Sequence, residues 1–551
     1  MTGRQKPTWM VLENPIFRRY CRSRLRLVGM GVWVLLAMII AGFIFFMSRQ
    51  IALYRADASL VDGARAALLP LLVFQGIVVF LLGTGQMAGG MTAEADEGVL
   101  DYQRLAPMSP LAKVLGFLFG LPVREWVMFF ATVPFTIYSL WRGEVPAQVW
   151  CSLYGVFISS ALLYHLTGLV AGTVMKNRRW AFLVSIGVIF CLYTIVPQVA
   201  KFGLVYFKYL TIRPVLDEVL PFLLPQDIGA IAETAQKLMP QAKFFGIGLP
   251  EAVFTVFAQG VLILTFLVML WRRWRRAESH LMGKGWAVGF FVWIQVMLLG
   301  NALPLIEPGL LFPSREMSRR FGRFIDRADW EPQPWEAMAM VATFGLVTLL
   351  VMWVVTVMIT PSAEGQKLGW RRVRKRGKAS IPLLSDPATA TWAVGLMAVV
   401  GAAGWYWFTN ALVGSRWFLG QDTDPLAPWI FLIVFLVCGF GFQALLEWKG
   451  GKKLGLAVIF IGVVPVMIGS VIAATDDRLV SVAMWFMGIS PVSAPVFAGM
   501  AVMPSAELPM EIVRSAPRAL LFWQGVGFLV ALRLLAGLRQ ARREISEKLK
   551  S

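Results

Sequence analysis

The sequence has few of the residue types on which most enzyme and metal sites depend. Only two histidines and four cysteines occur among 551 residues. The cysteines show neither a Cys-x-x-Cys motif nor paired spacing, so neither a disulfide framework nor a zinc site is indicated. With two histidines, histidine-rich metal chemistry is nearly excluded. We therefore expect no catalytic residues, no metal and no cofactor bound by this chain.

Charged residues are also scarce, and this sets the class of protein. They make up 15% of the chain against 58% hydrophobic residues, and the mean hydropathy is +0.66. Soluble proteins carry about a quarter charged residues. The composition predicts an all-α integral membrane protein with many spans. The net charge is +20. Lysines and arginines that keep loops on the cytoplasmic side of the membrane account for this charge, so no nucleic acid partner is expected.

Twelve apolar stretches are long enough to cross about 30 Å of hydrocarbon as helices. The first is too long for the apolar core of a cleavable signal peptide and is expected to remain as a span. The predicted spans are 27–47, 67–90, 123–140, 149–174, 180–200, 251–271, 286–306, 336–360, 392–412, 429–446, 454–474 and 519–538.

The distribution of basic residues predicts the orientation of these spans. Most lysines and arginines fall in loops on the side of the N-terminus, so both termini are expected in the cytoplasm. The spacing of the longer outer loops predicts two six-helix halves. The expected domains are an amphipathic entry helix within 1–26, a first half over 27–276, a second half over 277–538 and a basic cytoplasmic tail over 539–551.

Two segments complicate this topology. Residues 480–503 are apolar enough to span, but Pro491 and Pro495 interrupt any helix there. We predict a re-entrant or interfacial element on the outer side. The 307–335 loop carries an arginine-rich amphipathic pattern between Met317 and Ala328, which is typical of a helix on a membrane surface. Its side of the membrane stays open.

An acidic, turn-rich segment over 92–116 lies between the second and third spans. Glu94, Glu97 and Asp101 have helical spacing, which predicts that they share one face of a short helix. Pro107 and Pro110, on either side of Ser109, are expected to end that helix and turn the chain back toward the bilayer. A solvated loop with scattered charge would give the same composition.

This segment resembles the one that follows the second span in permeases of the ABC-2 transporter type. The resemblance rests on Thr92-Ala93-Glu94, Glu97-Gly98, the run Leu105 to Pro110 and Gly116. A second match is Asn14-Pro15 followed by Phe17 and several arginines, which is similar to the family's entry helix. The matches cover the first quarter of the chain. The family often has Gly-Lys where this chain has Gly116-Phe117, so Lys113 is not given that role.

The resemblance implies the membrane-spanning permease subunit of an ATP-binding cassette transporter, most often an exporter, in a bacterial cytoplasmic membrane. Its acidic segment would dock on a separate ATPase, expected in two copies, and ATP and Mg would bind to that partner. Membrane lipid and a second permease chain are further expected partners. The implied coupling residues are Glu94, Glu97, Gly98, Pro107, Ser109 and Pro110.

The chain itself carries no phosphate-binding loop. Gly369 to Lys378 is the nearest match, but its spacing is too long. In addition, Ala379 stands where the serine or threonine that holds magnesium would be. Any use of ATP therefore requires a partner chain.

Ionisable residues within spans are costly and are candidates for function. Arg124 and Glu125 begin the third span, and as neighbours they are expected to point to different faces of the helix. His165 lies in the fourth span, either as a proton or substrate contact or as a hydrogen-bonded packing residue. So few deep charges do not favour an ion-coupled carrier. A secondary carrier and a structural polytopic protein without an ATPase partner remain the alternatives, and we do not expect an enzyme.

Overall fold

The computed structural model describes residues 10–54, 59–225, 242–314, 331–377, 380–418, 422–449, 454–503 and 510–548. The chain divides into two compact units. Unit 1 contains residues 1–198, 207–242 and 248–277, and unit 2 contains residues 199–206, 243–247 and 278–551. The symmetry expected between two six-helix halves stays a prediction.

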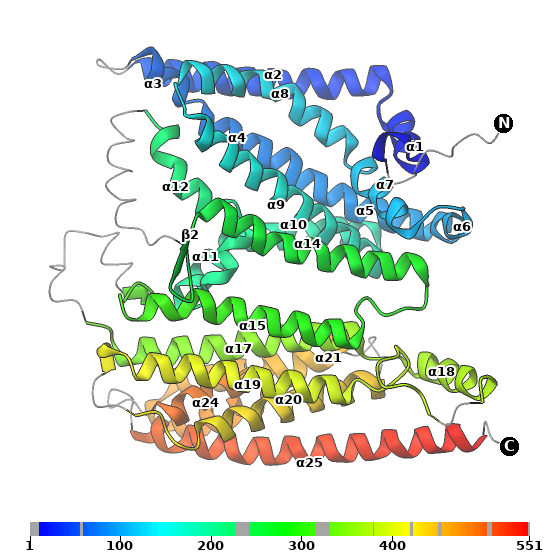
Figure 1. Ribbon diagram of the computed structural model, residues 1–551. Coiled ribbons are helices and arrows are strands. Elements are labelled where there is room, and N and C mark those ends of the chain that lie inside the picture. Colours follow the sequence, from blue (N-terminus) through cyan, green and yellow to red (C-terminus); the bar gives the residue numbers. More distant parts are fainter. Residues whose placement is uncertain are drawn as a thin grey trace. The chain divides into compact units, whose positions relative to one another are not determined.

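Unit 1 is built from helices that follow one another with short turns (Figure 1). A single 3-10 turn, η1, covers Val11–Glu13, and a π-helical segment, η2, covers Ile77–Gly83. The α-helices are α1 (Pro15–Arg24), α2 (Leu27–Leu53), α3 (Leu60–Arg65), α4 (Leu68–Gly76), α5 (Thr84–Asp96), α6 (Val99–Leu105), α7 (Pro110–Gly120), α8 (Val123–Arg142), α9 (Ala147–Val174), α10 (Arg178–Thr194), α12 (Arg213–Leu223) and α14 (Glu251–Arg275).

Unit 2 is also helical. Its long helices are α15 (Lys284–Ile306), α17 (Pro334–Ile359), α19 (Thr391–Val413), α20 (Ala427–Lys449) and α25 (Met510–Lys548). Shorter helices are α18 (Ala363–Lys375), α21 (Leu454–Ala457), the π-helical η6 (Val458–Val463), α22 (Val464–Thr475), α23 (Val480–Met487) and α24 (Ala494–Val502). The 3-10 segments of this unit are η3 (Ala200–Phe202), η5 (Arg416–Phe418) and η7 (Asp477–Leu479), and η4 (Val205–Leu210) includes residues of both units. Two further elements include residues of both units. They are α11 (Val196–Val199) and a two-stranded hairpin of β1 (Ala242–Phe244) and β2 (Ile247–Leu249), which lies between α12 and α14 in the sequence.

The predicted spans agree with the helices. Among the described residues, eleven helical segments are long and apolar enough to cross a membrane, or twelve if the bent pair α7 and α8 forms one span. Each of the twelve predicted stretches corresponds to one of these segments. The chain is therefore an all-α, multi-pass membrane protein. The location of its termini relative to the membrane stays a prediction.

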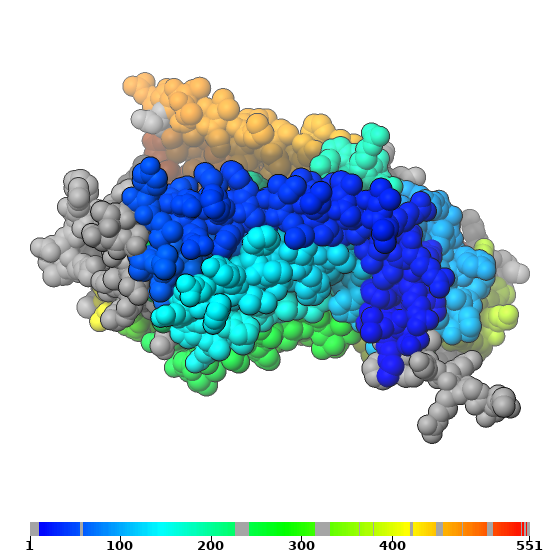
Figure 2. Space-filling model, turned by 90° about the horizontal axis from the view of Figure 1, so that it is seen from above, coloured from blue at the N-terminus to red at the C-terminus, as the bar shows by residue number. Residues whose placement is uncertain are grey.

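The exposure of apolar side chains supports the same conclusion. Along α2, Val28 is 83% exposed, Val32 is 62% exposed and Leu35 is 60% exposed. Figure 2 shows α2, in blue, lying along α8, in cyan, on one open face of unit 1. Soluble proteins rarely expose so large a continuous apolar surface. A bilayer around this face accounts for it.

Glycines let the helices inside unit 1 approach closely. A Cβ atom added to Gly172 in α9 would lie 2.7 Å from the carbonyl oxygen of Ala88 in α5. One added to Gly168, a turn earlier, would lie 2.7 Å from the carbonyl oxygen of Thr84. Gly85 meets Phe182 of α10 at 2.6 Å in the same way. Small residues at these positions allow the close packing of helices that is common in membrane proteins.

Three segments of unit 2 bear on the topology expected from the sequence. In the 480–503 segment the helix is broken between α23 and α24, and Ser490 Oγ in the break donates to the carbonyl oxygen of Gly462 at 2.6 Å. Neither short helix could span a membrane alone. The basic tail continues α25 as helix to Lys548. The amphipathic helix expected between Met317 and Ala328 lies outside the described residues.

The core of unit 2 is organised around Trp405 of α19, which is fully buried. Its indole stacks on Phe431 of α20 with ring centroids 3.9 Å apart. Its Nε1 donates to the carbonyl oxygen of Val341 in α17 at 2.7 Å. Gly345, one turn further along α17, leaves the room for the ring, because a Cβ there would lie 2.4 Å from indole carbons.

We predict that Gly345→Val destabilises the protein by about 1 to 3 kcal/mol, because overpacking must displace the buried indole. The measurement is the apparent melting temperature of the purified protein in detergent, followed by tryptophan fluorescence. Gly289→Val in α15 is the matched control, since a Cβ there meets no atom within 4 Å. Equal melting temperatures for the two variants would contradict this account of the core.

Candidate functional site

The first helix, α1, starts at a defined cap. Asn14 precedes it, and its Oδ1 accepts a hydrogen bond from the backbone N–H of Ile16 at 3.0 Å. Pro15 occupies the first helical position, where its missing N–H costs nothing. The helix is amphipathic, with Ile16 and Tyr20 buried and Arg18, Arg19 and Arg22 exposed.

The buried face of α1 lies against α7 (Figure 1). Asn14 Nδ2 donates to the carbonyl oxygen of Ala112 at 2.6 Å. The two helices approach closely at Gly116 and Gly120, where added Cβ atoms would lie 2.6 Å from Asn14 Oδ1 and 2.7 Å from the ring of Tyr20. The Gly-x-x-x-Gly spacing thus provides a groove for α1.

Glu94, at the end of α5, is bound to α1. Its Oε1 accepts from Tyr20 Oη at 2.6 Å and pairs with Arg19 Nη2 at 2.5 Å. Burial, together with the bond to Glu94, raises the pKa of the Tyr20 hydroxyl far above its ordinary value. The hydroxyl therefore stays protonated and donates. In this structure Glu94 joins the entry helix to the acidic segment.

The expectation that Glu94, Glu97 and Asp101 share one helical face is wrong. Helix α5 ends at Asp96, and Gly98 adopts a left-handed conformation with φ of 71° before α6 begins. Glycine accepts this conformation without a Cβ clash, so it ends the helix and redirects the chain. Asp101 consequently lies on a different helix, where it pairs with Arg104.

The rest of the segment turns as the prolines predict. Helix α6 ends at Leu105, and α7 begins at Pro110 with Ser109 as its cap. Ser109 Oγ accepts from the backbone N–H of Ala112 at 3.2 Å. Between these helices and along α6 the surface is open. The exposed residues there are Glu97, Gly98, Asp101, Tyr102, Leu105, Pro107 and Ser109, with Tyr102 78% and Leu105 83% exposed.

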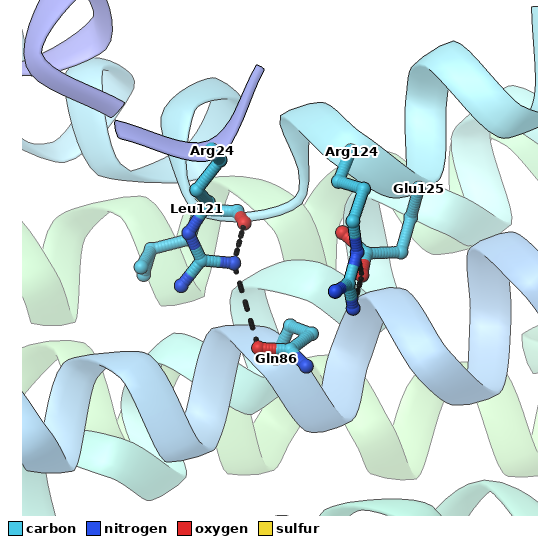
Figure 3. A network of polar contacts seen from close by, with 5 residues as sticks. All are labelled: Arg24, Gln86, Leu121, Arg124 and Glu125. Atoms are coloured by element: carbon cyan, nitrogen blue, oxygen red, sulfur yellow. Dashed lines mark hydrogen bonds and ion pairs between the residues drawn. The ribbon is translucent and has the colours of Figure 1, made fainter. Parts of the chain in front are cut away.

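Arg124 and Glu125 do not point to different faces, contrary to expectation. Arg124 Nη2 lies 2.7 Å from Glu125 Oε1, and Nε lies 3.1 Å from the same oxygen (Figure 3). Arg124 bends back along the first turn of α8 and also covers the ring of Trp33 in α2, 4.9 Å from its centroid. Glu125 is 1% exposed, so its ion pair offsets part of the cost of burying a carboxylate.

Arg24, near the end of α1, reaches the same region. Its Nη1 donates to the carbonyl oxygen of Leu121 at 2.6 Å and to Gln86 Oε1 at 3.4 Å (Figure 3). Leu121 lies at the break between α7 and α8, which meet at 51°. Burial lowers the pKa of Arg24, and the nearby Glu125 carboxylate opposes that shift. An arginine remains charged in such a setting. It thereby ties α1, α5 and the α7–α8 bend together.

His165 lies in the interior of unit 1 and contacts a backbone carbonyl there. It is fully buried in α9, and its Nε2 lies 3.0 Å from the carbonyl oxygen of Val79. Val79 belongs to η2, where the wider π-helical turn frees carbonyl groups from ordinary helix bonds. Gly83 makes room for the imidazole, since a Cβ there would lie 2.6 Å from Nε2.

No sequence pattern identified the side chains that hold the acidic segment. Tyr20 and Arg19 bind Glu94, and Gly120 makes room for Tyr20. The Gly-x-x-x-Gly spacing in α7 was a usable signal for a close helix partner. The identity of that partner could not be inferred, because nothing in the sequence links Asn14 to Ala112, which are 98 residues apart. No cluster of metal-binding side chains occurs in the part of the chain that the structure describes.

Comparisons with protein-family models, with curated proteins and with solved structures gave no match for this chain.

We predict that Arg19→Gln loosens α1 from α5. The Arg19 side chain is 43% exposed and Glu94 is 14% exposed, so the pair contributes at most about 1 kcal/mol. Amide hydrogen exchange of α1 is then expected to become about three- to five-fold faster. The measurement is exchange followed by mass spectrometry on the protein in detergent.

Arg18→Gln is the control for this prediction. Arg18 is exposed and pairs with Glu13, ahead of α1, at 2.7 Å rather than with α5. Exchange of α1 should change less than in Arg19→Gln. If both variants speed exchange equally, the Arg19–Glu94 pair has no special part in holding α1.

Proposed function

We propose that this chain is the membrane-spanning permease subunit of an ABC-2 type transporter. It works as an exporter in a bacterial cytoplasmic membrane and is driven by separate ATPase subunits. The ATPase supplies the sites for ATP and Mg. The resemblance of the 92–116 segment to the family's coupling segment is the basis of the proposal.

The observation that carries the proposal is the contrast between the two sides of this segment. One side is held firmly, by Glu94 on α1 and by the Ser109 cap of α7. The other side presents Glu97, Tyr102 and Leu105 to the exterior. Exposed aromatic and aliphatic side chains beside a carboxylate are suited to a protein partner.

The arrangement also suggests how motion would spread. A push on the exposed residues between α5 and α7 would move α6, and the turn capped by Ser109 connects α6 to α7. Helix α7 carries α1 in its groove and meets α8 at the bend. Such a packed group moves as one body, which is the usual form of a transporter's conformational switch. We assign Glu97 and Pro107 to the partner contact and Glu94 to the internal link.

We predict that Glu97→Lys releases the ATPase while the permease still inserts and folds. Reversing an exposed charge at an interface repels basic groups on the partner, and about a ten-fold or greater loss of affinity is expected. The measurement is purification of the tagged chain at native expression in mild detergent. Co-purifying ATPase is then identified and quantified by mass spectrometry and by ATP hydrolysis.

Glu547→Lys is the matched control, because Glu547 is exposed in the helical tail and shares the predicted cytoplasmic side. It should retain the ATPase. A chain that never brings an ATPase would overturn the proposal. If the Glu97→Lys variant retains the ATPase, the ATPase binds somewhere other than the acidic segment.

A further inference from the structure

A cavity of about 660 Å³ opens at one end of α8 and α9, on unit 1. One face of α8 forms its wall with Phe129, Val133, Ile137 and Trp141, which recur at helical spacing. Trp150 of α9 lines it as well. The volume is in the range of small-molecule sites, and the walls suit an acyl chain.

The inner end of the cavity is polar and fixed. Tyr154 and Thr136 line it, and both bind the buried Gln75 of α4. Tyr154 Oη donates to Gln75 Oε1 at 2.8 Å, and Gln75 Nε2 donates to Thr136 Oγ1 at 3.0 Å. Gln75 Nε2 also donates to Thr132 at 2.9 Å. These bonds hold the wall residues in place, so the cavity is preformed.

One charged side chain, Glu144, lines the cavity, and an arginine lies next to the rim without lining it. Glu144 lines the mouth, is exposed and lies in the turn between α8 and α9. Trp141 and Trp150 lie on the same rim. Arg142 is exposed beside them, with its guanidinium carbon 6.0 Å from the centre of the Trp141 ring. A carboxylate with tryptophan rings recognises an ammonium group, and an arginine recognises a phosphate.

We propose that this cavity is a binding site for one phospholipid with an amine head group. The acyl chain lies against the wall of α8, the ammonium group faces Glu144 and the tryptophans, and the phosphate faces Arg142. A phospholipid with an amine head group matches the apolar walls, the carboxylate at the rim and the arginine next to it. The proposal does not depend on the transporter assignment, because none of these residues belongs to the acidic segment.

The test is native mass spectrometry of the full chain, purified in detergent and given equal amounts of phosphatidylethanolamine and phosphatidylglycerol with identical acyl chains. The wild-type protein should retain one phosphatidylethanolamine in preference. Glu144→Gln should weaken its retention about five-fold and remove the preference over phosphatidylglycerol. Val133→Trp, which fills the cavity from the wall, should weaken retention of both lipids about ten-fold or more.

Val184→Trp in α10 is the matched control, since it places the same ring at a lipid-exposed position outside the cavity. It should bind as the wild type does. Circular dichroism and gel filtration establish that each variant is folded. If the wild-type protein retains the two lipids equally and Glu144→Gln changes nothing, the bound lipid is annular lipid only and the proposal is overturned. Unchanged lipid retention in folded Val133→Trp would also overturn it.

Discussion

The seating of α1 in the glycine groove of α7 is the interaction on which the candidate site depends. Helix α1 precedes the first span and could otherwise lie anywhere on a membrane surface. Gly116 and Gly120 bring its backbone close, and the buried amide of Asn14 fixes its register through the carbonyl of Ala112. Once α1 is fixed, Arg19 and Tyr20 are in place to bind Glu94. The acidic segment thus acquires a rigid side from residues far earlier in the chain.

The exposed residues along α6 matter because the other side of the acidic segment is held by α1. A loop that moved freely could bind a partner but could not pass a displacement to the spans. Here α6 lies between Gly98, which sets its direction, and the Ser109 cap, which starts α7. Arg24 adds a tie from α1 to Gln86 of α5 and to the carbonyl of Leu121, where α7 ends and α8 begins. Helix α6 packs against α5, and α7 packs against α1, so the acidic segment is connected to packed helices on both sides.

The membrane helices could be predicted from sequence because hydropathy over about 20 residues needs no knowledge of neighbours. The prolines around Ser109 were equally local signals, and the helix boundaries follow them. The side-chain geometry was not local. Spacing alone placed Glu94 and Asp101 on one face, but Gly98 ended the helix between them. As neighbours on a helix, Arg124 and Glu125 were expected on different faces. A long arginine side chain can bend back toward its neighbour where the ring of Trp33 packs against it.

Two buried polar side chains contact irregular backbone within predicted spans. His165 binds the carbonyl of Val79 in η2, and Ser490 binds the carbonyl of Gly462 in η6. In both cases a buried side chain meets a carbonyl in a π-helical stretch, where irregular backbone needs such a partner. These stretches lie in the second and the eleventh predicted spans, which are not equivalent places in two six-helix halves. A carrier built on paired broken helices would need equivalent ones. Within the described residues the irregular backbone is thus better explained by local packing.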